Sequence, residues 1–406
     1  MDPEDRWTDA FLDSLRAEAD PVADRTIEAL YAHGNIDEVN AVLGRLVCND
    51  GPVSDALPPA ARMYFEGTDQ LPAWADPALI ERGERVFMKY GLLGLVGLLG
   101  GALPECYGMA KGVKVLALTQ RLQAHTRRRL YETAQMVVDV MAPGGLGPHG
   151  HGIRTAQKVR LMHATIRHLL LLDPAEAQRT QRDQRSFAAV LGDQAWDPSL
   201  GLPINQEDMA FTLLTFDVVI RRTWKVLGAE LSPEDEAAYH HCWNVVGHIM
   251  GVRDDLLVPS VEDADALFRR IRDHQQGPCH EGQMLTRALL ETITDVLDLP
   301  VGGRLAPVVL MHVTLSPQTT TVLAVPPVPR LVSVLMVPVF AALNLVIDAR
   351  DALARDVPGF DRLTVYLGRR WVTRLTRIDR GGQRTLFRLP EQLATAWRIP
   401  RPAPTA

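Results

Sequence analysis

Apolar residues recur at every third or fourth position along most of this chain, and this spacing constrains the fold more than any other feature. The spacing is typical of amphipathic helices, and it is clear over 113–140, where Leu118 and Leu122 are followed by further apolar positions with arginines between them. Strand-like alternation is scarce, and only 308–313 and 319–325 are short strand candidates. The pattern therefore predicts an all-α protein.

Capping residues and helix breakers locate the helices. Asp76-Pro77 and Ser232-Pro233 each place a capping side chain before a proline that suits the first helical turn. The proline-rich stretch 50–76 predicts a loop, and the glycine-rich stretch 142–150 predicts a break. Further helices are expected over 20–49 with an interruption at His33-Gly34, 154–172, 180–194, 207–227, 261–275, 282–298 and 331–353.

Composition excludes several classes of protein. A hydrophobic content of 47% can build a sizeable core, and a net charge of −6 does not favour nucleic acid as a partner. The four cysteines (Cys48, Cys106, Cys242 and Cys279) are far apart, so neither a disulfide framework nor a zinc ribbon is indicated. Lone cysteines and an acidic N-terminus without an apolar signal segment predict a cytoplasmic protein.

Two uncharged apolar runs are candidates for membrane spans. The run 90–104 is interrupted by five glycines, and the run 331–347 contains Pro338. Both are short for a membrane span of roughly 20 residues. We expect buried helices, or helices that border an apolar substrate tunnel, and no membrane span.

Charge suggests how the chain is divided. From Arg369 onward, nine arginines stand against Asp379 and Glu391, which predicts a solvated tail or one with weak affinity for an anionic partner or a membrane surface. The sequence therefore predicts an N-terminal extension (1–20), one helical domain (21–368) and a basic C-terminal tail (369–406).

The best candidate for a functional residue is His163. On a helix, Arg160 and Arg167 lie one turn to either side of it. Two neighbouring cations disfavour a protonated imidazole, and a neutral imidazole is a good metal ligand. A haem meets both conditions, because its iron takes the imidazole and its propionates take the guanidinium groups. The alternative is a core histidine on an ordinary amphipathic helix.

A second group lies on the preceding predicted helix. Arg129, Glu132 and Thr133 have the spacing that places side chains on one helical face, and they could form a polar patch in an apolar pocket. The alternative is a surface ion pair between Arg129 and Glu132.

Two further patterns provide other hypotheses. The segment 145–150 has the spacing Gly-x-Gly-x-x-Gly and precedes a helix, which leaves an NAD(P)-dependent oxidoreductase open, although no strand precedes it and Pro148 removes an amide. Histidines also cluster, and a site for two metal ions is conceivable, but no motif typical of zinc proteases or di-iron bundles occurs. These histidines are His149, His151, His240, His241 and His248.

Taken in order, several segments resemble the haem-dependent oxygenases of the latex-clearing protein and MpaB type. The resemblance covers roughly residues 30 to 260, and its most specific part is Arg-x-x-His-Ala-x-x-Arg around His163. The matching segments are 71–74, 129–133, 159–167, 201–209, 212–216, 239–243 and 246–252.

The resemblance implies an all-helical, globin-like bundle that encloses a b-type haem. It implies that His163 is the proximal iron ligand, that Arg160 and Arg167 serve the propionates, and that Arg129 and Thr133 lie on the distal side. The family's chemistry is oxidative cleavage of carbon–carbon double bonds in polyisoprene or prenyl chains, with O₂ and without a reductant.

One residue departs from the family. Latex-clearing members carry a lysine where this chain has Glu132, and that lysine can coordinate the iron from the distal side. A carboxylate could act as a base or hydrogen-bond to oxygen or water instead. We therefore expect a haem b oxygenase that acts with O₂ on an apolar, alkene-like or prenyl-like substrate, with a non-catalytic haem-binding protein as the other alternative.

Overall fold

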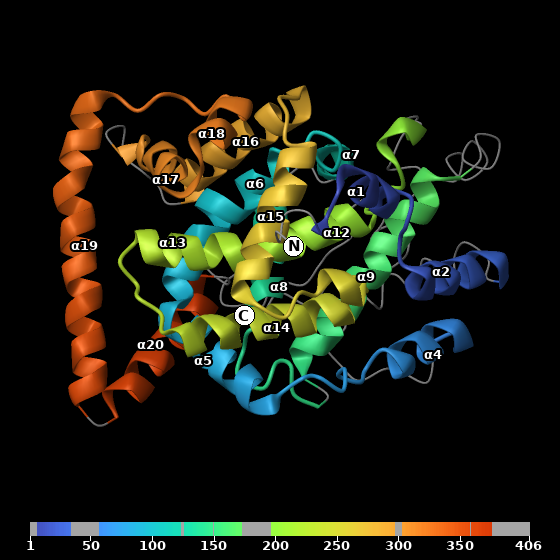
Figure 1. Cartoon of the computed structure of the whole chain (residues 1–406), viewed down its shortest axis with the longest axis horizontal. Helices are drawn as coiled ribbons and strands as arrows, with labels where there is room; N and C mark the ends of the chain where they lie inside the picture. The colour runs from blue at the N-terminus through green and yellow to red at the C-terminus, as the bar shows by residue number, and fades with distance from the viewer. Residues whose placement is uncertain are drawn as a thin grey trace, which may run out of the picture.

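The computed structural model describes residues 6–33, 57–122, 126–148, 150–172, 196–296, 303–357 and 359–375. Within these ranges the only β-structure is one isolated antiparallel bridge between Met109 and Gln276. All other regular structure there is helical, so the all-α prediction is confirmed (Figure 1).

The helices form a layered body with one long helix at its edge (Figure 1). In chain order they are α1 (Asp9–Arg16), α2 (Pro21–His33), α4 (Pro59–Gly67), α5 (Pro77–Gly97), η2 (Leu98–Ala102), α6 (Leu103–Tyr107), α7 (Val113–Leu122), α8 (Thr126–Val140), α9 (His151–Leu170), η3 (Pro198–Leu200), α12 (Gln206–Leu214), η4 (Thr215–Val219), α13 (Ile220–Val226), α14 (Pro233–Ile249), η5 (Asp254–Leu256), α15 (Val261–Gln275), α16 (His280–Val296), α17 (Ala306–Thr314), α18 (Pro317–Val322), α19 (Arg330–Asp356) and α20 (Phe360–Leu375).

The two proline-marked helix starts are confirmed. The Asp76 carboxylate accepts a hydrogen bond from the Ala78 amide at the start of α5, at 2.8 Å. The Ser232 hydroxyl accepts one from the Asp235 amide at the start of α14, at 3.2 Å. Each cap satisfies an amide that the first helical turn leaves without a partner.

The predictions of a loop over 50–76 and of two short strands are wrong. The stretch 50–76 was expected to be a loop, but α4 begins at Pro59 within it, where proline is tolerated in the first turn. Both strand candidates are helical, since they fall on α17 and α18. The helix expected over 180–194 lies outside the described residues.

The centre of the core lies between α5 and α14. Gly83 allows this close approach, because a β-carbon there would lie 2.5 Å from both the Ala238 carbonyl oxygen and the Cys242 sulfur. Next to this contact, the rings of Trp224 and Tyr239 pack with centroids 4.7 Å apart. Both side chains are fully buried.

The apolar run that includes 90–104 belongs to this core. By length and composition alone, Pro77–Tyr107 is the one stretch among the described residues that could cross a membrane, and 67% of its apolar window is buried. That share agrees with the expectation of a buried helix. Glycines bring it close to its neighbours, since a β-carbon at Gly97 would lie 3.2 Å from the Thr223 side chain.

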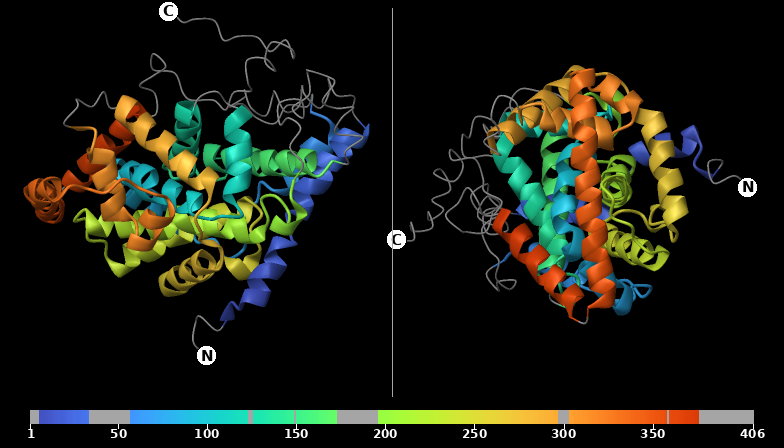
Figure 2. Two further views of the ribbon diagram at one scale, coloured as in Figure 1. Left: turned by 90° about the horizontal axis from the view of Figure 1, so that it is seen from above. Right: turned by 90° about the vertical axis from the view of Figure 1, so that its left-hand side faces the viewer.

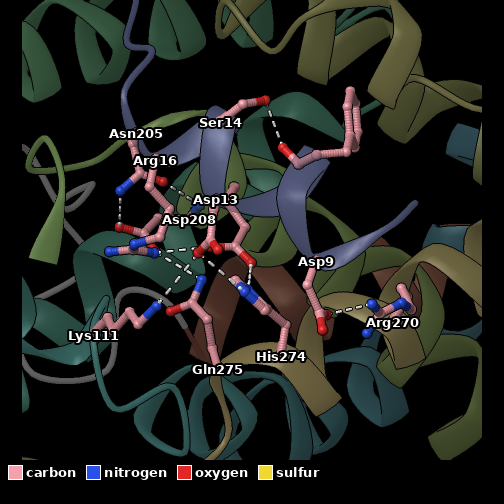
Figure 3. Close-up of polar contacts among 12 residues, drawn as sticks. Asp9, Asp13, Ser14, Arg16, Lys111, Asn205, Asp208, Arg270, His274 and Gln275 are labelled. Carbon is pink, nitrogen blue, oxygen red and sulfur yellow. Dashed lines mark hydrogen bonds and ion pairs between the residues drawn. The ribbon is translucent and has the colours of Figure 1, made fainter.

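The first helix is part of the same body, contrary to the prediction of an extension over 1–20. Leu12 and Leu15 are fully buried in the main core. On the polar side of α1, Arg16 binds Glu207 at 2.9 Å and Asp208 at 3.0 Å (Figure 3 shows Arg16 with Asp208). The helix is therefore held by apolar packing on one side and by ion pairs on the other.

The C-terminal helices also differ from expectation. The run 331–347 was expected to be buried or to border an apolar substrate tunnel. It lies on α19 at the edge of the body, and Leu331 and Leu345 are 70% and 69% exposed, so it is not a buried helix. In addition, α20 continues to Leu375, past the predicted start of the tail at residue 369.

Candidate functional site

The predicted site residues come from two consecutive helices, α8 and α9. Glu132 and Thr133 are half-buried on α8, and His163 is half-buried on α9. Arg129 is also on α8, but its side chain lies outside the described part of the chain. The two helices contact each other and are joined by a glycine-rich turn, so the relative placement of Glu132 and His163 depends on that turn.

A buried carboxylate from α5 holds the turn. Glu84 is 3% exposed, and its carboxylate accepts hydrogen bonds from the Gly144 amide at 2.8 Å and the Leu146 amide at 3.2 Å. Burial raises the pKa of Glu84, and the backbone amides act against this rise. At the end of α8, Asp139 accepts a hydrogen bond from Thr155 of α9 at 3.2 Å, which joins the two helices directly.

This arrangement does not support the dinucleotide-binding hypothesis. The amides of Gly144 and Leu146 are already bound by Glu84, and those of Gly145, Gly147 and Gly150 donate to backbone carbonyls within the turn. A pyrophosphate would need such amides to be accessible. The helix α8, rather than a strand, precedes the turn.

The glycine spacing has a packing explanation instead. A β-carbon at Gly150 would lie 2.6 Å from the Gly144 carbonyl oxygen, and one at Gly152 would lie 2.7 Å from the Val140 α-carbon. Gly144 adopts φ = +75°, a conformation that favours glycine. These glycines therefore allow the end of α8 and the start of α9 to pack backbone against backbone.

Arg160 has a carboxylate partner beside α2. Its guanidinium group binds both oxygens of Asp20, the residue before α2, with Nη2 at 2.7 Å from Oδ1, and donates to the Ile249 carbonyl at 3.1 Å. Arg160 and Asp20 are 8% and 2% exposed. Gly251 leaves room for this pair, because a β-carbon there would lie 2.5 Å from Asp20 Oδ2.

Arg167 is held in a similar way, one helical turn beyond His163. It binds Asp24 on α2 at 2.8 Å and donates to the carbonyl oxygens of Pro203 and Ile204. Ile204 has φ = +53°, and Asn205 next to it caps α12. The segment 201–209, which belongs to the family resemblance, is thus the point where α9 and α12 are joined.

The expectation that both arginines bind haem propionates stays a prediction, and within the protein they have other partners. Each guanidinium group is already paired with a carboxylate at the start of α2 and with backbone carbonyls. The partners Asp20 and Asp24 are four positions apart in the sequence. No local pattern links them to α9, which is distant in the chain. In the structure, both arginines fix the orientation of the helix that carries His163.

The surroundings of His163 fit a haem iron better than a bare metal ion. Among the described residues, no group of three His, Cys, Asp or Glu side chains could hold an ion. A haem iron takes four nitrogens from its own ring and needs only one axial imidazole. The α9 residues near His163 pack in an apolar cluster, which includes Met162, Ile166 and Trp196. An apolar wall and a single imidazole are compatible with haem.

Within the histidine cluster, His240 has a structural role. His240 lies 2.7 Å from Asp217 through Nδ1 and 2.8 Å from the Val258 carbonyl through Nε2, so both ring nitrogens face acceptors. Burial acts to lower the pKa of His240, but the Asp217 carboxylate outweighs this effect and the pKa is raised. Arg221 is the third member of this buried network, at 2.7 Å from Asp217.

The remaining histidines of the cluster are near the surface. His241 accepts a hydrogen bond from the Asp76 amide at 2.9 Å, and His248 lies 3.4 Å from Asp254. Both rings contact Trp74 edge-on. His151 is exposed at the start of α9, and His149 lies outside the described residues.

Glu105 is a further buried acid that the sequence did not reveal. Glu105 on α6 is 4% exposed, and Thr319 is its hydrogen-bond partner at 3.3 Å. Burial raises the pKa of Glu105 to about 7, although Arg272 and Arg222 act in the opposite direction. Only the three-dimensional packing reveals this burial, because the sequence around Glu105 has no motif.

Comparisons with known proteins agree with the fold and the site segments. A rubber oxygenase of Streptomyces sp. (strain K30) is 29% identical over 304 residues, which is 73% of this chain and 65% of that protein. This chain therefore spans less than two thirds of that relative's length. A solved structure of latex clearing protein LCP in the closed state has 26% sequence identity and a TM-score of 0.64, and the match covers 88% of this chain and 91% of that chain.

The family follows from a match that spans both candidate helices. Residues 84–377, which include α8 and α9, match the family described as ER-bound oxygenase mpaB/B'/Rubber oxygenase, catalytic domain. The match covers well over half of the chain, and the resemblance seen in the sequence is confirmed. The chain belongs to the mpaB and rubber oxygenase catalytic domain family.

Proposed function

We propose that this protein is a haem b-dependent oxygenase that uses O₂ to oxidise an apolar alkene, such as a prenyl or polyisoprene-like chain. The observation that carries the proposal is His163, a single half-buried imidazole on a helix held rigidly by two ion pairs, in a chain of the rubber oxygenase family. Cleavage of the double bond is the reaction that the family relationship favours.

In this proposal, His163 would hold the haem iron, and the bound haem would supply the chemistry that activates O₂. Asp20 and Asp24 hold α9 through Arg160 and Arg167, so that the imidazole keeps one orientation. Such support matters because an axial histidine is effective only when its ring is oriented by its surroundings. Arg160 and Arg167 are therefore positioning residues here.

We assign the handling of protons to α8. Glu132 and Thr133 are half-buried neighbours, which allows contact with both protein and substrate. A carboxylate and a hydroxyl can hold a water molecule or move a proton beside the reacting double bond. Arg129 completes the predicted polar patch on this helix.

We also propose a reducing, cytoplasmic location. Of the four cysteines, Cys106 and Cys242 are buried and unpaired in the structure, and Cys279 is half-buried and unpaired. Free thiols of this kind persist most readily in a reducing compartment. The protein would then meet an intracellular prenyl-type substrate.

The proposal is tested by oxygen consumption with a defined polyprenyl substrate, followed by detection of carbonyl products. The purified haem-loaded protein should consume O₂ only when the alkene is present and should yield aldehyde or ketone ends. A protein that binds haem but consumes no oxygen with any alkene would be a haem carrier or sensor instead.

A variant of Glu132 tests the assignment of α8. Glu132→Ala should retain haem but lower the rate of oxygen consumption by about 100-fold, the usual size of a general acid or base contribution. Glu66→Ala, an exposed acid on α4, is the matched control and should keep the original rate. An unchanged rate in Glu132→Ala would remove the proposed role.

A further inference from the structure

An uncharged apolar surface runs along one side of α19. Leu331, Val334, Leu345 and Val346 are 66–70% exposed. At about 100° per residue, these four positions fall on the same side of the helix. No charged residue occurs over 331–347, and the exposed carboxylates of α19, Asp348 and Asp356, follow that run. Soluble proteins rarely leave a contiguous apolar surface of this kind exposed.

The next helix, α20, combines apolar residues and arginines on its exposed side. Leu363, Tyr366 and Leu367 are 42–59% exposed. Arg362 and Arg370 are exposed as well, and their spacing places them on the same helical side. The described exposed positions of this side carry no carboxylate. The surface is therefore apolar and cationic together.

The two helices contact each other at one edge of the molecule. In the right-hand view of Figure 2, α19 stands at the front and α20 crosses beside it. Their attachment to the body is firm, because the Tyr90 hydroxyl of α5 donates to Asp351 at 2.8 Å and the Arg350 guanidinium stacks on the Tyr90 ring at 4.6 Å. Gly368 lets α20 lie directly against the backbone of α5 at Met88. We call the exposed side of α19 and α20 the C-terminal surface.

We propose that the C-terminal surface docks onto an anionic lipid membrane. Apolar side chains would enter the boundary between headgroups and acyl chains, while arginines reach the phosphates. The residues that follow α20 reinforce this charge, since nine arginines against two acidic residues occur from Arg369 to the last residue, in a chain with net charge −6. Basic segments of this kind bind anionic headgroups.

The geometry favours docking along the membrane rather than crossing it. The uncharged run 331–347 has Pro338 inside it and is shorter than the roughly 20 residues that a span needs. Its C-terminal end is anchored to α5 through Asp351. The inference stands independently of the haem and of the proposed reaction.

The test is flotation of the full-length protein with vesicles of phosphatidylcholine alone or with added phosphatidylserine. We expect binding to the anionic vesicles and a decrease at high salt. Leu345→Glu with Val346→Glu should abolish flotation, whereas Met63→Glu, which is 69% exposed on α4, should not. Replacing Arg362 or Arg370 by Gln should weaken binding by about fivefold for each arginine.

Two results would overturn the proposal. The first is no flotation with either kind of vesicle. The second is a dimer in analytical ultracentrifugation that Leu345→Glu with Val346→Glu dissociates, in a protein that does not float. In that case a second copy of the chain, rather than lipid, would cover the C-terminal surface.

Discussion

At the scale of single residues, the arginines on either side of His163 have partners that their sequence motif does not indicate. A basic pair around a histidine suggests a site for an anion, and Asp20 and Asp24 provide that anion from within the protein. The Arg160–Asp20 pair is almost completely buried, so each charge depends on the other for its solvation.

Removing one partner of this pair should be costly. Asp20→Ala leaves a buried guanidinium without its carboxylate, and we expect a loss of about 3–5 kcal/mol in the free energy of unfolding. The matched control is Asp24→Ala, because the Asp24 side chain is 24% exposed and water can replace it in part. Urea denaturation measures both. Equal losses in the two variants would contradict the account.

Glu105 should make stability depend on pH in the direction opposite to an ordinary surface acid. Its pKa is raised from 4.5 to about 7 by burial, so the unfolded chain releases this proton more readily than the folded protein. Raising the pH through this window therefore favours unfolding. Glu105→Gln should be more stable than the original protein at pH 8, by about 3 kcal/mol, and equally stable near pH 4.

The measurement is the midpoint of urea unfolding at several pH values. Glu66→Gln provides the matched control, because Glu66 is exposed and its replacement should not alter the pH dependence. If Glu105→Gln is destabilised equally at pH 4 and pH 8, the ionisation of Glu105 is not what limits stability.

At the scale of elements, the turn between α8 and α9 sets the relation between the two halves of the candidate site. Glu84 binds its amides, and glycines permit the contact between the helix ends. The turn resembles a nucleotide loop in spacing only. A buried carboxylate occupies the position that a ligand phosphate would need.

A methyl group at Gly150 tests this packing. Gly150→Ala should destabilise the protein by about 1–3 kcal/mol, because its β-carbon would overlap backbone oxygens that cannot move freely. Gly67→Ala at the end of α4 is the control, since nothing lies within 4 Å of its β-carbon position. Thermal unfolding compares the two. A Gly150→Ala variant with the same stability as the original protein would contradict this account of the packing in the turn.

Much of the element order could be predicted from the sequence, and the misses have identifiable causes. Asp76 and Ser232 marked helix starts because capping is a local interaction. The helix α4 was missed because clustered prolines are typical of loops. Pro59 lies in the first turn of this helix, where the missing amide has no cost. Local patterns also could not reveal the Asp20–Arg160 pair, since its residues come from distant parts of the chain.

At the scale of the whole molecule, the family match over residues 84–377 includes both the central body and the helices α19 and α20 at its edge. The apolar run of α19 was expected to be buried or to border a substrate tunnel, because length and hydropathy alone do not distinguish a core helix from an exposed one. The run on α5 has a similar composition and is buried. The apolar runs of α5 and α19 differ in burial because neighbouring helices cover the first and leave the second exposed.

The central claim is that His163 holds a b-type haem, and the visible absorption spectrum tests it most directly. The purified protein, as isolated and after reduction with dithionite, should show a strong Soret band and a pyridine haemochrome typical of haem b. His163→Ala should fold but lose the haem, while His151→Ala, an exposed histidine on the same helix, should keep it. A protein that stays colourless after haem is supplied, or a His163→Ala variant with full haem content, would contradict the account.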